Sequence, residues 1–213
     1  MNLWTEGVLG LMICANLALL GTSRITAGIQ LLAFQGVLLG LLTLFAHTGG
    51  LTVRVAALAA GSVFLKSFVF PRLLTWALRE TRARQEFEPY VGYTWSMLIG
   101  VLAVWVSMGL GRTFPVRAGG PGLAIPVALS TIFCGVFLIV SRRKAITQVL
   151  GYLLLENGIF VFGVMRVIEV PLLVELGVLM DVFVAVLVMS IAAHHINREF
   201  DHTDVDRLDT LKG

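Results

Sequence analysis

Three carboxylates stand in otherwise apolar stretches of the second half of the chain. Glu156 lies midway along one apolar run, and Glu175 and Asp181 lie in the next run. A charge at the centre of a bilayer costs at least about 2.5–3.5 kcal/mol on insertion scales, so such residues face the interior of a helix bundle or water and often mark ion or proton pathways. The alternative interpretation is that these carboxyl groups only fix helix packing through hydrogen bonds.

Buried carboxyl groups of this kind are suited to moving a proton. Each stays neutral unless water or a cation stabilises its charge. Two such groups connected by water titrate as a coupled set, so that one ionises while its neighbour holds the proton. Lys66, in an earlier apolar run, would favour the charged form of the nearest acid if it lies on the same path. A lysine there can also snorkel to the membrane surface or form a structural ion pair, and the sequence leaves these roles open.

The elements that position these residues are membrane helices. The chain has 213 residues, of which 57% are hydrophobic and 14% are charged, and this composition is typical of membrane proteins. A helix needs about 20 apolar residues to cross a hydrocarbon core about 30 Å thick. The sequence therefore predicts an all-α integral membrane protein with about seven transmembrane helices. Their predicted ranges are 3–22, 25–47, 51–73, 91–111, 122–140, 145–166 and 172–193.

The basic residues predict the orientation of these helices. Positive residues are concentrated in cytoplasmic loops. Their distribution favours an outside N-terminus and a cytoplasmic C-terminus, in a bacterial or archaeal cytoplasmic membrane. The inside loops and tail would hold Arg24, Arg72, Arg79, Arg82, Arg84, Arg142, Arg143, Lys144, Arg198, Arg207 and Lys212, whereas the outside loops would hold Arg54, Arg112, Arg117 and Arg166.

The chain divides into four predicted parts. Residues 1–88 form a first three-helix membrane repeat without the carboxylates, and residues 89–140 form two uncharged packing helices. Residues 141–199 form the carboxylate helix pair, and residues 200–213 form a cytoplasmic tail. The most polar linker of the chain ends at the first of these boundaries, which is why the boundary is placed there.

A weak internal repeat relates the first and third parts. In one register Gln35 aligns with Glu156, and in the following helices Ser62 aligns with Asp181. Both copies would have the same orientation, and parallel repeats are a known way to build membrane domains. The first copy would then have lost both carboxylates and gained Lys66.

Glu156 and Asp181 are predicted to lie at similar depth in the membrane. Glu156 is twelve residues after Lys144, and Asp181 is thirteen residues before His194. At a rise of about 1.5 Å per residue, both acids lie about 18–20 Å from the inside face. Helices joined by a short connection are antiparallel neighbours, so a proton could pass laterally between the two acids through one or two waters.

The second half of the chain resembles the small K subunit of respiratory complex I. The matching features are the basic turn Arg142-Arg143-Lys144, a helix that runs from Gly151 to a mid-membrane Glu156, a second helix with its own acid, and an acidic tail that ends in glycine. K subunits are much shorter than this chain. The doubled form, the seven spans and the tail resemble the hydrogenase-4 component E family, whose members are membrane subunits of formate hydrogenlyase-type and related energy-converting hydrogenase complexes.

The resemblance implies roles for individual residues. Glu156 matches the first membrane glutamate of the K subunit, and Asp181 matches the second, although its side chain is one methylene shorter. Glu175 has no clear counterpart and would replace the relay or extend it toward the outside. The family implies a place in the ion-translocating membrane arm, beside large antiporter-like subunits.

The main prediction is a non-catalytic membrane-arm subunit of an energy-converting hydrogenase-like or complex I-like assembly. It would move protons or sodium ions through Glu156, Asp181, Glu175 and Lys66. The chain has no Cys-x-x-Cys pair, no nucleotide-binding loop and no paired histidine motif for haem, so we expect neither cofactor nor metal. Redox chemistry would belong to a soluble iron–sulfur, hydrogenase-type module, and no nucleic acid is expected as a partner.

Three other functions remain open from the sequence. The chain could be a subunit of a multisubunit cation/proton antiporter, a purely structural membrane anchor, or an autonomous small-molecule transporter. The sequence does not specify the ion, the electron donor and acceptor, or the stoichiometry. It also does not reveal whether the helices contain π-bulges.

Overall fold

Helices make up the regular secondary structure of the part of the chain that is described. The computed structural model describes residues 3–46, 60–61, 63–80, 90–113, 122–166, 177, 179–180 and 182–190. A helix without a label covers residues 182–190. The labelled elements are α1 (Leu3–Gly21), α2 (Ile25–Ala46), the π-helical turn η1 (Leu65–Val69), α4 (Phe70–Glu80), α5 (Tyr93–Gly111), α6 (Ala124–Ser141) and α7 (Ala145–Arg166).

Five of the described helices are long and apolar enough to cross a membrane. These are Leu3–Gly21, Ile25–Phe45, Tyr93–Gly111, Ala124–Ser141 and Ala145–Val164. They match five of the seven predicted spans and confirm an all-α membrane protein. The other two predicted spans, 51–73 and 172–193, lie partly outside the described residues, as does the polar linker, and the tail lies wholly outside them.

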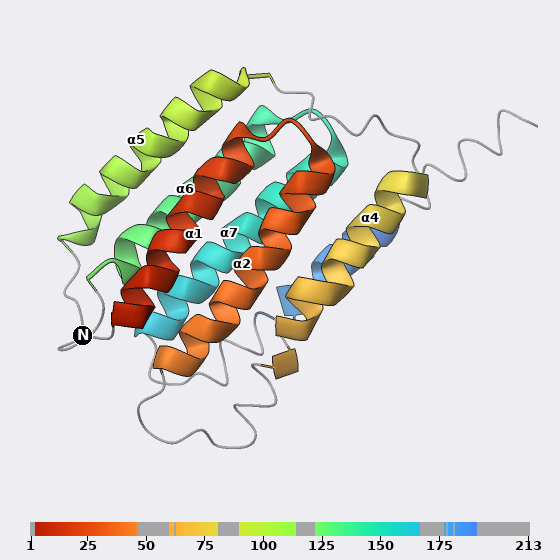
Figure 1. Ribbon diagram of the computed structural model, residues 1–213. Coiled ribbons are helices and arrows are strands. Elements are labelled where there is room, and N and C mark those ends of the chain that lie inside the picture. The colour runs from red at the N-terminus through yellow and green to blue at the C-terminus, as the bar shows by residue number, and fades with distance from the viewer. Residues whose placement is uncertain are drawn as a thin grey trace, which may run out of the picture.

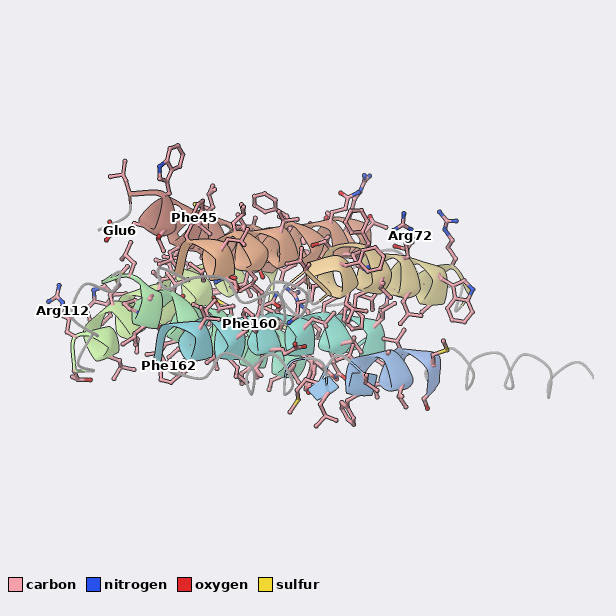
Figure 2. The ribbon with its side chains drawn as sticks, turned by 90° about the horizontal axis from the view of Figure 1, so that it is seen from below. Glu6, Phe45, Arg72, Arg112, Phe160 and Phe162 are labelled. Carbon is pink, nitrogen blue, oxygen red and sulfur yellow. The ribbon has the colours of Figure 1, made fainter. Side chains whose placement is uncertain are left out.

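The helices form a bundle of two layers. Helices α1, α2, α6 and α7 make its centre, α5 lies along one edge beside α1 and α6, and α4 lies at the opposite edge beside α2 (Figure 1). Viewed along the layers, α1, α2 and α4 lie in one layer, and α6, α7 and the 182–190 helix lie in the other (Figure 2). Glu6 and Arg112 lie toward one end of the bundle, and Arg72 lies toward the other (Figure 2).

Helices α6 and α7 approach each other closely because glycines face the contact. A Cβ atom added to Gly135 would lie 2.5 Å from the backbone nitrogen of Leu155, and one added to Gly151 would lie 2.8 Å from that of Ile139. Small residues permit such close packing between membrane helices. Because Glu156 follows Gly151 by five residues, it lies about 140° around α7 from this contact. The packing of α7 on α6 therefore turns Glu156 away from α6, toward the other layer.

Candidate functional site

Lys66 of η1 and Glu156 of α7 form a buried ion pair. Lys66 Nζ lies 2.5 Å from Glu156 Oε1, and each side chain is only 6% exposed. The same ammonium group donates a hydrogen bond to Asn157 Oδ1 at 3.3 Å. It also lies 5.6 Å from the centre of the Phe160 ring, within cation–π range. Lys66 therefore points into the bundle and does not snorkel.

Two of the four residues predicted for the relay are thus in direct contact. The other two, Glu175 and Asp181, lie outside the described residues. Phe160, which packs beside the ammonium group, lies between the two layers of the bundle (Figure 2). The structure accordingly places Lys66 and Glu156 where the layers meet.

The π-turn η1 sets the direction of Lys66. In this turn the Phe70 N–H donates to the carbonyl of Leu65, five residues earlier. Pro71 follows directly; it has no N–H, and in a regular α-helix its ring would clash with the carbonyl four residues before it. A wider turn relieves that conflict. Such π-turns are rare and occur frequently at functional sites.

Glycines on α2 allow η1 to come close. A Cβ atom on Gly36 would lie 2.9 Å from Ser67 Oγ and 3.0 Å from Lys66 Cβ. A Cβ atom on Gly40 would collide with a methyl group of Val63. The backbone around Lys66 can therefore lie against α2, and the lysine side chain reaches α7 across the interface of the layers.

A chain of neutral polar side chains leads from the ion pair through the bundle. Asn157 Nδ2 donates to Gln35 Oε1 at 3.3 Å, Gln35 Nε2 donates to Asn16 Oδ1 at 2.7 Å, and Asn16 Nδ2 donates to Thr131 Oγ1 at 2.8 Å. The Thr131 hydroxyl then donates to the carbonyl of Val127 at 2.7 Å. All four side chains are buried. We call these four residues the amide chain; it links α7, α2, α1 and α6.

The sequence indicated only part of the amide chain. Asn16 makes hydrogen bonds with Gln35 of α2 and Thr131 of α6. Gln35 was singled out only by its alignment with Glu156, and Thr131 by nothing. Each is a polar side chain in an apolar span, and that signal could have identified both as candidates for interhelical hydrogen bonds.

Two cavities of water size adjoin Lys66. Each has a volume of about 10 Å³, which is about the space that one water molecule needs. One is lined by Ile29 and Leu32 of α2, and the other by Gly40 and Thr43 farther along the same helix. Because these residues follow one another along α2, the cavities lie on opposite sides of Lys66 along the bundle axis.

The second oxygen of Glu156 is buried without a hydrogen-bond donor. Glu156 Oε1 accepts from Lys66, whereas Oε2 makes no hydrogen bond with any part of the protein that the structure describes. A buried acceptor with no donor is destabilising, so a donor such as a water molecule would be bound favourably at this oxygen.

Arg142, which the sequence predicted to lie in the basic inside turn, is a second buried cation. Its side chain is fully buried at the end of α6, and Nη2 donates to the carbonyl of Leu20 at 3.2 Å. The guanidinium also lies 5.4 Å from the centre of the Tyr93 ring. Burial lowers the pKa of Arg142 below its usual value, and the nearby Tyr93 raises it to a smaller extent. Arg142 thus joins the ends of α6 and α1 to the beginning of α5.

The described ranges contain no group of three or more histidine, cysteine, aspartate or glutamate residues that could hold a metal ion. Cys14 and Cys134 are both free thiols. The groups gathered around Lys66 are a carboxylate, an ammonium group and neutral amides. Such groups can bind and transfer protons.

These features define an all-α membrane protein whose helices enclose an ion pair and a polar chain. The chain is 31% identical over 158 residues to hydrogenase-4 component E of Escherichia coli K12 and of Shigella flexneri, which covers 73% of this chain and 72% of each of those proteins. It therefore belongs to the hydrogenase-4 component E family, as the resemblance predicted.

A longer match covers nearly the whole chain. The uncharacterized protein Rv0085 of Mycobacterium tuberculosis is 30% identical over 207 residues, which are 95% of this chain and 93% of that protein. No family model matches the chain. No solved structure matches it either.

Proposed function

We propose that this chain is a non-catalytic membrane subunit of an energy-converting hydrogenase-like complex and that it moves protons through Glu156 and Lys66. Its membership of the hydrogenase-4 component E family supports a place in a hydrogenase complex. The observation that carries the translocation step is the buried Lys66–Glu156 pair beside two cavities of water size.

Stability alone is a weak reason for such a pair. Removing two charges from water costs more than their attraction returns in many proteins, and replacing a buried pair by apolar residues is often neutral or stabilising. In the membrane interior, ionisable residues mark ion and proton pathways by default. The position of Lys66 and Glu156 between the layers therefore favours a functional role over a purely structural one.

One proton can cross the pair in three steps. A proton first binds Glu156 Oε2, the oxygen that has no donor among the described residues. This removes the negative charge beside the ammonium group and so favours release of a proton from Lys66 to water on the other side. The Glu156 carboxyl group then turns its O–H toward the neutral Lys66 amine, where Oε1 now lies 2.5 Å from Nζ, and the proton passes to the amine. The ion pair is restored, with one proton taken up and one released.

The site favours protons over sodium ions. A sodium ion needs several oxygen ligands, and of the oxygens that Glu156 and Asn157 offer only Glu156 Oε2 accepts no hydrogen bond from the described residues; the other two are Glu156 Oε1 and Asn157 Oδ1. Both of these oxygens already accept hydrogen bonds from the Lys66 ammonium group. A second cation would also be repelled by that charge.

Asp181 and Glu175 complete the proposal. Asp181 would exchange protons laterally with Glu156 at similar depth, and Glu175 would extend the relay toward the outside.

The proposed orientation, with the N-terminus outside, places the cavity beside Ile29 toward the cytoplasm and the cavity beside Thr43 toward the opposite side. A reporter fused after Gly213 should then lie in the cytoplasm, and an exported reporter would contradict this orientation.

The proposed partners are antiporter-like membrane subunits and a soluble iron–sulfur, hydrogenase-type module. Co-purification tests them. A hydrogenase-type complex should retain a partner with two Cys-x-x-Cys motifs together with iron–sulfur subunits. Recovery of membrane chains alone would favour the cation/proton antiporter.

The experiment that tests translocation compares Glu156→Gln with Glu6→Gln. Both changes remove a titratable group while keeping size and hydrogen bonding, but Glu6 lies in the first turn of α1 at the end of the bundle. Proton uptake into proteoliposomes is measured with the whole complex, alongside redox turnover in the presence of an uncoupler. We expect Glu156→Gln to abolish uptake and to spare uncoupled turnover, and Glu6→Gln to behave as wild type. Normal uptake by Glu156→Gln in an assembled complex would leave a structural anchor as the better explanation.

A further inference from the structure

We propose that the amide chain formed by Asn157, Gln35, Asn16 and Thr131 is a directional hydrogen-bond chain that keeps an oxygen facing Lys66. Asn157 contacts the Lys66 ammonium group, and Gln35, Asn16 and Thr131 act on the ion pair only through Asn157. The four residues are therefore positioning residues for the ion pair. This inference rests on the proposed function, since it concerns how the lysine is held during proton transfer.

The end of the chain at α6 has one permitted direction. A threonine hydroxyl has a single hydrogen to donate, and Thr131 donates it to the carbonyl of Val127 at 2.7 Å. Toward Asn16, therefore, Thr131 Oγ1 can only accept. The Asn16 side chain must present its NH₂ group to Thr131 and its oxygen to α2.

This direction propagates along the chain. Because Asn16 presents an oxygen to α2, Gln35 must present its NH₂ group there, at 2.7 Å, and its own oxygen to α7. Asn157 must then donate its NH₂ group to Gln35, and its remaining group, Oδ1, faces Lys66. The opposite orientation of any one amide would place two donors or two acceptors against each other.

The end of the chain at Lys66 matches this direction. An ammonium group has only donors, and Lys66 Nζ donates to Asn157 Oδ1. Gln35, Asn16 and Thr131 are 0% exposed, so water has no ready access to replace a lost partner. The hydroxyl of Thr131 on α6 thus determines which atom of Asn157 the lysine meets.

The oxygen of Asn157 has a role when Glu156 is protonated. At that stage of the cycle the ammonium group no longer faces a carboxylate, and Asn157 Oδ1 remains as its acceptor. Lys66 is then held within reach of Glu156, ready to accept the proton of Glu156 after releasing its own. If the side-chain amides could flip and exchange the positions of their O and NH₂ groups, Lys66 would face an NH₂ group for part of the time. The charged form of Lys66 would then be disfavoured.

Few of the described charged groups surround Lys66, so the pH profile of coupled proton uptake reports on the protonation of Lys66. Among the described residues, α2 carries no charged residue, Glu156 of α7 forms the ion pair, and the described arginines of α4, Arg72 and Arg79, are exposed. Loss of the directional chain should therefore move the alkaline limb of the profile to lower pH, because Lys66 then loses its proton more readily.

The test replaces the hydroxyl at the far end of the chain. Thr131→Val removes it at nearly constant volume, Thr131→Ser retains it, and Gln35→Met interrupts the chain from another helix. Ser130→Ala is the matched control, because the Ser130 hydroxyl donates to the same Val127 carbonyl at 2.9 Å but is no part of the chain. Coupled proton uptake by the whole complex is measured from acid to alkaline pH.

We expect the alkaline limb to move down by about 0.5–1 pH unit in Thr131→Val and Gln35→Met, which corresponds to the loss of about one hydrogen bond. Thr131→Ser should restore the wild-type profile, and Ser130→Ala should retain it. Profiles of Thr131→Val and Gln35→Met that match Ser130→Ala would overturn the inference, and so would failure of both variants to assemble, which would mark the chain as packing alone. If Glu156→Gln pumps normally, the proposed function fails separately, whatever these profiles show.

Discussion

Lys66 and Glu156 are 90 residues apart in the chain, yet their charged atoms lie 2.5 Å apart inside an apolar bundle. The lysine comes from a π-turn that lies against α2, and the glutamate comes from the face of α7 that is turned away from α6. Neither residue has a charged neighbour of its own on the adjoining turns of its helix. The pair is therefore a product of helix packing, and its two members should be coupled in every property that depends on charge.

That coupling predicts a non-additive effect on stability. Lys66→Met leaves a carboxylate buried near the centre of the bundle and should destabilise the protein by about 3–5 kcal/mol, whereas the double variant Lys66→Met with Glu156→Met removes both charges and should lie near wild type. Thermal unfolding of the purified complex measures this difference. The double variant should still fail to pump protons; pumping by it would exclude the relay.

The proline after the π-turn provides a second prediction. Pro71→Ala restores a backbone N–H and allows η1 to wind as a regular α-helix, in which one residue fewer per turn would rotate Lys66 by about 100°. We expect assembly to be retained and coupled proton uptake to fall at least about tenfold, because the buried contact with Glu156 is worth more than one factor of ten in equilibrium constant. The neighbouring change Leu73→Ala, on the same helix, serves as the control. Unchanged uptake by Pro71→Ala would show that the wide turn is not required.

The close contact of α6 with α7 can be tested at Gly135. An added methyl group there would lie 2.5 Å from the backbone nitrogen of Leu155, so Gly135→Ala must move one helix. We expect a loss of about 1–3 kcal/mol of stability and weaker proton uptake, since α7 carries Glu156. Gly10→Ala on α1 is a matched change, because nothing lies within 4 Å of its added methyl group. Equal melting temperatures for the two variants would contradict this account of the helix contact.

The exposed face of α5 predicts a contact with partner subunits. Trp105 is 73% exposed on a helix that has no charged residue, and large aromatic side chains contribute strongly to interfaces. Trp105→Ala should reduce recovery of the assembled complex severalfold while the redox and pumping rates per assembled complex stay near wild type. Trp4→Ala, at the equally exposed start of α1, is the comparison. Normal assembly with lost pumping would instead place α5 on the ion path.

The membrane class and the position of Glu156 could be predicted from the sequence. A span depends on about 20 consecutive apolar residues, and tertiary contacts do not change that composition, so five of the predicted spans agree with the described helices. The acid in the middle of one span, together with the basic turn before it, also carried the resemblance to the family. Glu175 and Asp181 were chosen on the same grounds and remain predictions.

The partners of Glu156 were decided by tertiary structure. The sequence offered Lys66 as a candidate but could not choose between snorkelling and pairing, and it gave no reason to connect Asn16, Gln35 and Thr131, which lie on three different helices. The physical reason is that membrane helices are apolar on most sides. Their periodicity therefore does not reveal which side faces inward, and the rotation of each helix is determined by close packing at glycines such as Gly36 and Gly135. Only that packing brings the polar side chains of four helices into one hydrogen-bonded chain.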